Sequence, residues 1–355
     1  MAGSVCIGFE SAQEAWRLVG MRVAQDNPPA NGTSPLLVRL LFETGEPVDM
    51  GSMPAHSRAT KIPSRVDVTA LSDLRRAEPE LAATPQQLCV SSRNGRRFVS
   101  AADCRLVTGS YPIGSFYRLS DGALLASPEL AFLQMARELD FDLLVLYGHE
   151  LCGYFARTSQ DPGFVNCPPL TSAARIAEYL DRLEALRQER GEGMPWGLGP
   201  ARRALRHIRD HAASPEEAVV SMVLTLPCRL GGYGLPPAAL NERVRLSTEA
   251  ARLFGIDSFV CDLSWDGGRV LEYQGSQHKI RSRRAYDMRK GNVLAADGRS
   301  VVEMDRSMLS RQDLMDEVAK SVTRLLGLTW RAPGAKPATR RARLRNKLIA
   351  HIDER

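Results

Sequence analysis

The sequence of 355 residues lacks several features that would assign it to a common class of protein. It contains no apolar run of 18 or more residues, and its start, MAGSVCIGFESAQEAWRLVG, has neither the basic region nor the apolar core of a secretory signal. Its seven cysteines lie far apart and form no CxxC pair, which argues against a zinc site. We therefore expect a cytoplasmic protein that has no membrane partner and keeps its thiols reduced and mostly buried.

Three local motifs are incomplete in ways that weaken a catalytic interpretation. The glycine-rich stretch GGYGLPP is not followed by GK[ST], so it is not a phosphate loop, and we interpret it as a link between two helices. His149 and Cys152 have no identifiable acid to orient them, which favours packing over a thiol nucleophile. His207 and His211 have the spacing of metal ligands on a helix but no nearby third ligand, which favours a solvated or DNA-facing stripe.

The composition that the sequence does have is that of a basic globular protein. Apolar residues make up 44% and charged residues 25%, and the length suffices for two or three domains. The formal net charge of +6 is consistent with an anionic partner such as nucleic acid, although many basic proteins have none.

The first 192 residues divide into a mixed α/β unit and a helical segment. In residues 1–126, SAQEAWRLVGM and SPLLVRLLFET have helical apolar spacing, and QQLCVSS, DCRLVTG and SFYRLSDGALLA are typical of short strands. Residues 127–192 begin with Ser127 as a helix N-cap followed by Pro128, and TSAARIAEYLDRLEALRQER repeats the helical pattern. The glycine- and proline-rich GEGMPWGLGP at 191–200 then predicts a domain boundary.

Residues 200–328 have the element order of an α/β domain. SPEE at 214–217 opens a helix, and after it come a strand, a DGG turn, a second strand, a basic helix, the strand RSVVEMD and a last helix. This order predicts a mixed sheet with helices on its faces. The remaining residues, 329–355, are strongly basic and predict either a mobile arm or a docking helix.

Two acids face each other in the hairpin of this domain. If the turn is centred on Gly267, residues whose numbers sum to 534 are paired, which places Asp262 opposite Glu272 with Cβ atoms roughly 5 Å apart. Because side chains alternate along a strand, we expect one core face and one polar face. The core face is predicted to hold Phe259, Cys261, Leu263, Trp265, Leu271 and Tyr273, and the polar face Val260, Asp262, Ser264, Val270, Glu272 and Gln274.

Two interpretations fit this acidic pair. Like charges that face each other destabilise a sheet, and a divalent cation would offset the repulsion, since Mg²⁺ favours one or two carboxylates. Alternatively, the acids lie on a solvated face and meet water and arginines. The basic segment HKIRSRRAYDMRK after the hairpin supplies cations for a phosphate backbone, so acids and cations together favour phosphodiester cleavage. Its candidate nucleic-acid-binding residues are His278, Lys279, Arg281, Arg283, Arg284 and Arg289, and Lys290 ends the segment.

Four motifs follow one another in the C-terminal domain: SPEE with Glu217, DLSW with Asp262, EYQGSQH with Glu272 and Gln274, and DMRKGNVLAADG with Asp287. In this order and spacing, residues 203–328 resemble the PD-(D/E)XK nuclease superfamily, and within it the small very-short-patch-repair-like domains. The preceding half, with its strand-rich unit and the helix start SPEL at Ser127, more faintly resembles AbiEi-like abortive-infection antitoxins.

The nuclease resemblance implies a restriction-endonuclease-like fold that acts on DNA, with Mg²⁺ or Mn²⁺ held by Asp262 and Glu272 and assisted by Glu217. Asp287 would support the site or merely cap a helix. Gln274 stands where the superfamily has a lysine that orients the attacking water. His278 or Lys279 would then have to serve instead, or the metal alone, or activity is lost.

Two functions from different classes follow. The first is a magnesium-dependent DNA endonuclease in a defence, mobile-element or repair setting. The second is a catalytically degenerate nuclease fold that acts as a DNA-binding, antitoxin-like regulator, with a toxin or defence protein as its partner. The intact acids favour the first, and Gln274 favours the second.

Overall fold

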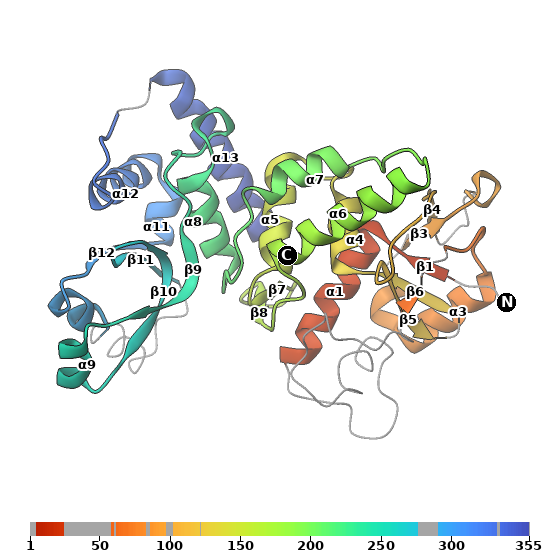
Figure 1. Cartoon of the computed structure of the whole chain (residues 1–355), viewed down its shortest axis with the longest axis horizontal. Helices are drawn as coiled ribbons and strands as arrows, with labels where there is room; N and C mark the ends of the chain where they lie inside the picture. Colours follow the sequence, from red (N-terminus) through yellow and green to blue (C-terminus); the bar gives the residue numbers. More distant parts are fainter. Residues whose placement is uncertain are drawn as a thin grey trace. The chain divides into compact units, whose positions relative to one another are not determined.

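The computed structural model describes residues 5–24, 58–59, 62–82, 86–96, 102–120, 122–275, 290–331 and 334–354. Within these ranges the protein is a mixed α/β structure with three sheets, in which parallel and antiparallel pairs both occur and helices flank the strands (Figure 1). The chain divides into an N-terminal unit, Met1–Thr158 with Val165–Ile208, and a C-terminal unit, Ser159–Phe164 with Arg209–Arg355. None of the helices in these ranges combines the length and the apolar composition that a bilayer-spanning segment needs.

The N-terminal unit is built on a six-stranded sheet. Its strand order is β2-β5-β6-β1-β3-β4, with β1–β6 and β3–β4 parallel and the other neighbours antiparallel. The strands expected in QQLCVSS, DCRLVTG and SFYRLSDGALLA are confirmed, whereas the buried β1 is too short for its sequence pattern to reveal it. The strands are β1 Val5–Ile7, β2 Arg58–Ala59, β3 Gln86–Val90, β4 Ala102–Leu106, β5 Phe116–Ser120 and β6 Ala123–Ala126.

Helices pack on this sheet and on one another. The helix expected in SAQEAWRLVGM is α1, whose buried Trp16 donates from Nε1 to the carbonyl of Ala126 at 2.9 Å. Ser127 caps α4 as expected, since its Oγ accepts from the amide of Leu130. The helix expected in SPLLVRLLFET falls outside the described residues. The helices are α1 Phe9–Ala24, α3 Val68–Ala77, α4 Pro128–Met135, α5 Phe141–Leu151, α6 Ala173–Glu189 and α7 Leu198–Leu205, and a two-stranded sheet joins β7 Phe155–Arg157 and β8 Phe164–Asn166.

The division between the units falls later than the glycine- and proline-rich stretch at 191–200. α7 follows that stretch and packs on α5 and α6, with Ala201 and Ala204 fully buried. Residues 127–192 therefore share one compact unit with the six-stranded sheet and with α7. GEGMPWGLGP is a connection inside the N-terminal unit, and the C-terminal unit starts at Arg209 apart from the short segment Ser159–Phe164.

The C-terminal unit is built on a four-stranded sheet of order β12-β11-β10-β9. The pairs β9–β10 and β10–β11 are antiparallel, and the pair β11–β12 is parallel, which a crossover through the helical residues 290–296 allows. The expected order of elements is confirmed within the described residues, except that β9 lies between GGYGLPP and the next helix and the short α11 precedes the last expected helix, while residues 276–289 of the basic segment lie outside those residues. The elements are α8 Pro215–Thr225, β9 Ala239–Arg245, α9 Thr248–Phe254, β10 Ser258–Trp265, β11 Arg269–Gln274, β12 Ser300–Asp305, α11 Arg306–Ser310, α12 Gln312–Leu325 and α13 Ala335–Asp353.

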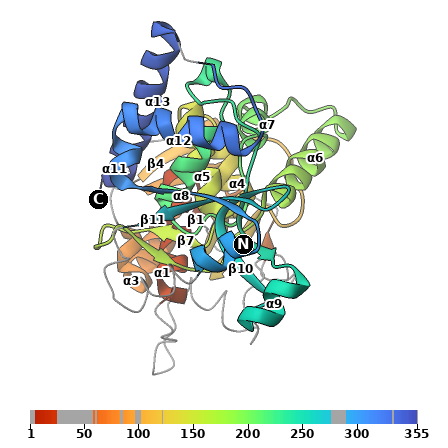
Figure 2. The same ribbon diagram turned by 90° about the vertical axis from the view of Figure 1, so that its left-hand side faces the viewer.

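The basic C-terminal segment forms α13, a helix docked on the C-terminal unit. Its Leu344 and Leu348 are buried and it packs against α8, while Arg341 lies over the ring of Tyr233 at 4.2 Å. Figures 1 and 2 show α13 and α9 at opposite ends of the unit. Of the two alternatives for residues 329–355, the docking helix is therefore correct, because α13 carries an apolar stripe among its arginines.

Candidate functional site

The hairpin of the C-terminal unit has the register that the turn predicts. β10 and β11 pair Leu263 with Leu271 and Ser264 with Val270, so paired residue numbers sum to 534. The turn between Trp265 and Arg269 has three residues, and two of them, Gly267 and Gly268, have φ values of +77° and +71°, a conformation that favours glycine. The ladder between β10 and β11 ends at Leu263 and Leu271, so Asp262 and Glu272, which this register would set opposite each other, are not themselves paired in it.

The regular pairing is interrupted at Asp262. The pairs between β9 and β10 include Cys261 with Glu242 and Leu263 with Leu240, and they omit Asp262 and Asn241. Asn241 adopts a φ of +48° there, and the Asp262 Oδ2 atom accepts a hydrogen bond from the amide of Tyr273 at 2.7 Å. The Asp262 carboxylate is thereby fixed against β11 beside Glu272.

All six residues of the predicted core face are buried, as expected, but Val270 of the predicted polar face is buried as well. Phe259 and Cys261 pack in one core cluster with Val270, which the pleat was expected to place on the other face. The cluster also holds Val293 and Leu294 from the helical residues 290–296. Along β10 the alternation of buried and more exposed residues holds from Phe259 to Leu263, whereas Ser264 and Trp265 are both buried.

Glu272 lies in a buried ion pair with Lys290. The Lys290 Nζ atom is 2.6 Å from Glu272 Oε2, and the side chains are 10% and 13% exposed. The second oxygen, Oε1, is buried and has no hydrogen-bond partner in the described part of the chain. Burial and the charge of Asp262 together outweigh Lys290 and raise the pKa of Glu272 to about 7.

Lys290 holds its proton tightly. Burial alone lowers the pKa of its ammonium group, but the charge of Glu272 and the hydrogen bond to it more than offset this, and the pKa lies above its usual value. Both members of the pair therefore have raised pKa values. This occurs because acids outnumber cations in the immediate surroundings, with Asp262 adding a second negative charge beside Glu272.

Glu217 completes a capping box at the start of α8. Its amide donates to the hydroxyl oxygen of Ser214 at 3.1 Å, and its own carboxylate accepts from that hydroxyl and from the amide of Ala213. Asn241 Nδ2 adds a hydrogen bond of 2.6 Å to Oε2. Burial, and after it the charge of Asp262, raises the pKa of Glu217 to about 7. Glu217 is thus close enough to sense Asp262, but three donors occupy its two oxygens.

The three predicted carboxylates are only partly brought together. Asp262 influences both Glu217 and Glu272, yet no group of three His, Cys, Asp or Glu side chains in the described ranges is close enough to hold a metal ion. The neighbouring Glu216 is no substitute, because its Oε1 faces Arg306 Nη1 at 3.9 Å and it lines a separate small cavity.

Of the other predicted site residues, the structure places Gln274 and does not describe the rest. Gln274 is the last residue of β11 and pairs in the sheet with Asp305 of β12, while Asp305 caps α11 by accepting from the amide of Met308. The remaining candidates fall outside the residues that the structure describes: His278, Lys279, Arg281, Arg283, Arg284, Asp287 and Arg289.

Two residues of the site are hard to identify from sequence alone. The sequence shows that Lys290 is a cation at the end of the basic segment, but it does not show which group Lys290 contacts. The contact with Glu272 depends on how the helix that carries Val293 and Leu294 packs on the sheet. Asn241 gives no sequence signal at all, although it contacts both Glu217 and the carbonyl of His211.

The histidine and cysteine motifs lie elsewhere. His149 and Cys152 are both fully buried at the end of α5, in agreement with a packing role. The expected helical stripe of His207 and His211 is wrong, because α7 ends at Leu205 and His211 has a φ of +74°. His207 instead lies edge-on to the ring of Phe141.

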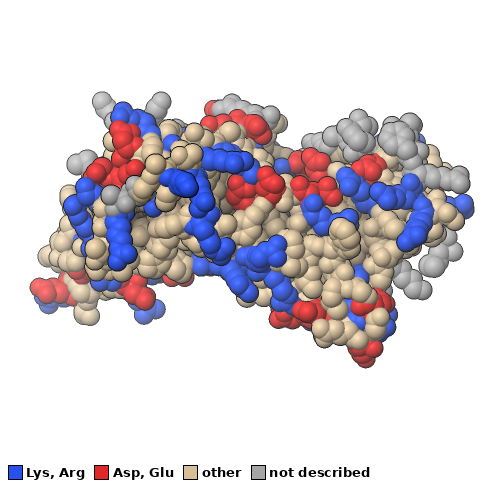
Figure 3. Space-filling model, turned by 90° about the horizontal axis from the view of Figure 1, so that it is seen from above, with Lys and Arg blue, Asp and Glu red and all other residues tan. Residues whose placement is uncertain are grey.

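On the one face that Figure 3 draws, the basic side chains of the described residues form clusters and no continuous basic surface. Blue Lys and Arg groups alternate there with red acidic groups and tan surface (Figure 3).

Comparison of the chain with protein-family models, with curated proteins and with solved structures finds no match.

Proposed function

We propose that the C-terminal unit cleaves phosphodiester bonds in DNA with the help of Mg²⁺ or Mn²⁺, in a defence, mobile-element or repair setting. The observation that carries the proposal is the meeting of Asp262, Glu272 and Lys290 on one hairpin and its following helix. The arrangement of α8, three antiparallel strands, a helix and a parallel strand is also the one expected for a restriction-endonuclease-like unit.

The acidic pair fits a divalent cation. Glu272 Oε1 is buried and meets no strong hydrogen-bond donor among the described residues, since the nearby Cys261 thiol is only a weak donor, and this suits an oxygen that a cation would contact. Asp262 and Glu272 would hold the ion, because Mg²⁺ needs only one or two carboxylates and keeps several waters. When bound, the ion supplies an acidified water and neutralises charge on the phosphate. Glu217 is not among its ligands, since its oxygens are used by the capping box and Asn241.

Lys290 takes the part that Gln274 cannot take. A glutamine amide positions water but adds no charge, whereas the Lys290 ammonium stays protonated near neutral pH and is held beside Glu272. It therefore acts as a hydrogen-bond donor and a fixed positive charge rather than as a general base. The burial of Val293 and Leu294 on the same helix fixes where that charge lies.

Glu217 and Asn241 act as positioning residues in this proposal. Asn241 uses its amide to link Glu217 Oε2 with the carbonyl of His211, and its positive φ lies opposite the break at Asp262. The pair therefore holds the start of α8 against the interrupted strand and keeps the Asp262 carboxylate in place.

The proposal is tested by a cleavage assay on single-stranded, duplex and mismatched DNA with Mg²⁺ or Mn²⁺. We expect Asp262→Ala and Lys290→Met to lose at least tenfold in rate. Asp266→Asn, an exposed acid in the turn of the same hairpin, is the matched control and should cleave like the native protein. Native rates in both site variants would overturn the catalytic assignment.

A second candidate function is a DNA-binding regulator without catalysis. The Lys290–Glu272 ion pair favours it, because an ammonium group already neutralises the carboxylate that a metal would use. In that case the native protein should bind DNA without cutting it under any metal condition, and Lys290→Met should leave binding within twofold.

A further inference from the structure

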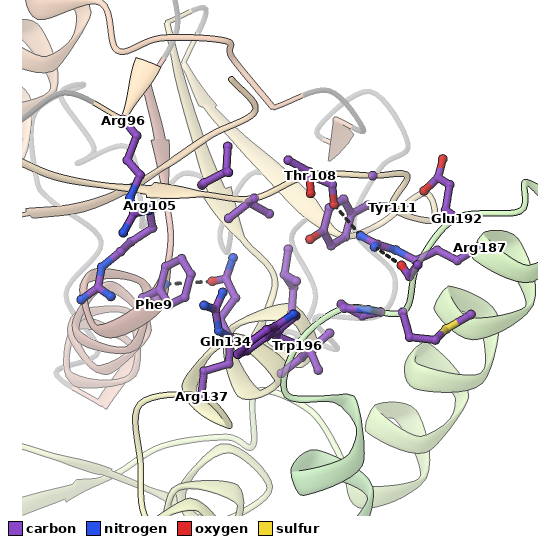
Figure 4. Close-up of a pocket in the computed structure, with 18 residues that line it drawn as sticks. Phe9, Arg96, Arg105, Thr108, Tyr111, Gln134, Arg137, Arg187, Glu192 and Trp196 are labelled. Atoms are coloured by element: carbon purple, nitrogen blue, oxygen red, sulfur yellow. Dashed lines mark hydrogen bonds between the residues drawn. The ribbon is translucent and has the colours of Figure 1, made fainter. Parts of the chain in front are cut away.

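The N-terminal unit contains a cavity of about 610 Å³ that has no part in the acidic site. Its walls come from the start of α1, β4 and the loop after it, α4, the end of α6 and the loop before α7 (Figure 4). This volume lies in the range of small-molecule sites. The cavity is therefore large enough for a ligand of nucleotide size.

The cavity wall is strongly positive. Four arginines line it, and Glu192 is the one acid among the lining residues. Arg105 is already paired with Asp103 at 2.7 Å and with Glu138 at 3.3 Å. The other lining arginines are Arg96, Arg137 and Arg187.

Arg187 is used to build the wall. Its buried guanidinium donates to the carbonyls of Thr108, Ser110 and Gly193, at 2.7, 3.2 and 2.8 Å, and lies 5.0 Å from the ring centroid of Tyr111. Arg96 and Arg137 are both exposed, and neither makes an ion pair with a carboxylate of the described residues. These two arginines are therefore the ones that can take an anion from solution.

An aromatic platform stands beside one of these two arginines. Trp196 is 80% exposed, and the Arg137 guanidinium carbon lies 5.7 Å from its ring centroid. In Figure 4 these two side chains lie together, with Gln134 beside them and Arg96 and Arg105 on the opposite side of the cavity. An exposed tryptophan next to cations is a surface on which a nucleic-acid base stacks.

The floor of the cavity is held rigidly. Phe9 has a φ of +53°, which is unfavourable for a residue with a bulky side chain. Its amide donates to Gln134 Oε1 at 2.8 Å, and the Gln134 amide donates to Cys89 Sγ. Arg105 lies over the Phe9 ring at 5.7 Å. Strain of this kind persists where surrounding contacts over-determine it, so the cavity is shaped before a ligand arrives.

We propose that this cavity binds a nucleoside phosphate, with the base stacked on Trp196 and the phosphate held by Arg137 beside the indole, while Arg96 adds positive charge from across the cavity. Arginine forks match phosphate oxygens, and the exposed indole matches a flat ring. The nucleoside phosphate is either a free nucleotide or the 5′-terminal nucleotide of a single strand, since both present the same groups. This site is independent of the acidic cluster of the C-terminal unit.

Isothermal titration calorimetry on the full chain tests the proposal. The probes are AMP, GMP, CMP and UMP, the matching nucleosides, inorganic phosphate, and an oligothymidylate of five nucleotides with and without a 5′-phosphate. We expect nucleotides to bind more tightly than phosphate or nucleosides. Tighter binding of the 5′-phosphorylated strand than of mononucleotides identifies a strand end as the ligand, and the reverse order identifies the free nucleotide.

Two variants separate the two halves of the site, and two more serve as controls. Trp196→Ala should weaken nucleotide binding about 5- to 150-fold and leave phosphate binding unchanged. Arg137→Ala should weaken both. Arg182→Ala, an exposed arginine of α6 away from the cavity, is the matched control, and Asp262→Ala should bind like the native protein.

Two results overturn the proposal. One is the absence of heat with every nucleotide and strand at millimolar concentration. The other is equal affinity for nucleotides, nucleosides or phosphate together with an unchanged affinity in Trp196→Ala, since stacking and phosphate recognition would then not be combined.

Discussion

Raising the pH should destabilise the C-terminal unit, because two of its buried carboxyl groups hold their protons unusually tightly. Glu217 and Glu272 both have pKa values near 7, raised by burial and then by the charge of Asp262. At pH values above the carboxyl pKa in the unfolded chain, these two groups bind more protons in the native state than in the unfolded state. The free energy of unfolding therefore falls as the pH rises through the carboxyl pKa of the folded state. Acids with lowered pKa values, such as Asp297 and Asp305, act at lower pH and do not contribute between pH 5.5 and 7.5.

The size of the effect follows from the shifts. A rise from 4.5 to about 7 for one group corresponds to about 3 kcal/mol, at about 1.36 kcal/mol per pKa unit. About 2 kcal/mol of this is lost between pH 5.5 and 7.5. Because both groups respond to the same Asp262, their losses do not add fully, and we expect a total of about 2 to 4 kcal/mol.

Urea unfolding of the full chain in EDTA, at several pH values across this window, measures the loss. Val270→Ala, a core change in the four-stranded sheet, identifies the transition of the C-terminal unit. Glu272→Gln should flatten the fall, whereas Glu242→Gln, an exposed acid on β9, should leave it unchanged. A native free energy of unfolding that is constant from pH 5.5 to 7.5, or a fall that is equally steep in Glu272→Gln, would refute the reasoning.

Three further outcomes are expected. Lys290→Met removes the cation that favours ionised Glu272, so the carboxyl pKa read by carbon NMR should rise further above 7, and an unchanged value contradicts the ion pair. Leu348→Ala removes a fully buried side chain between α13 and α8 and should cost about 2 to 5 kcal/mol in urea unfolding, whereas the exposed Arg343→Ala should cost less than about 0.5 kcal/mol. Ser214→Ala breaks the capping box and should cost about 1 kcal/mol in the same assay, and no loss would show that the hydroxyl is dispensable.

The hairpin was predictable because its information is local. Two glycines after Asp266 fix a tight turn, and the turn fixes which residues pair, so the register about Gly267 follows from a few neighbouring residues. The break at Asp262 was not predictable in the same way. It depends on Asn241, which lies on a strand whose sequence, ALNERVR, has no clear apolar alternation.

The candidate site shows a second limit of sequence reasoning. The pattern S-x-x-E at Ser214 and Glu217 suits both a capping box and an acid of a metal site, and the two cannot be distinguished without the positions of the donors. Lys290 and Glu272 lie 18 residues apart, and their contact depends on how a helix packs on the sheet. The arginines and Trp196 of the N-terminal cavity come from five separate segments, so no short motif marks them.

The docking of α13 on α8 makes the C-terminal unit slow to complete during synthesis. α8 begins at Pro215 and packs partly on β10, but the helix that covers its other side ends at Asp353, so that side stays uncovered until almost the whole unit has been made. At roughly 5 to 20 residues per second, this interval lasts on the order of ten seconds. A chain that stops before Leu344 leaves the side of α8 that faces α13 open to chaperones and proteases.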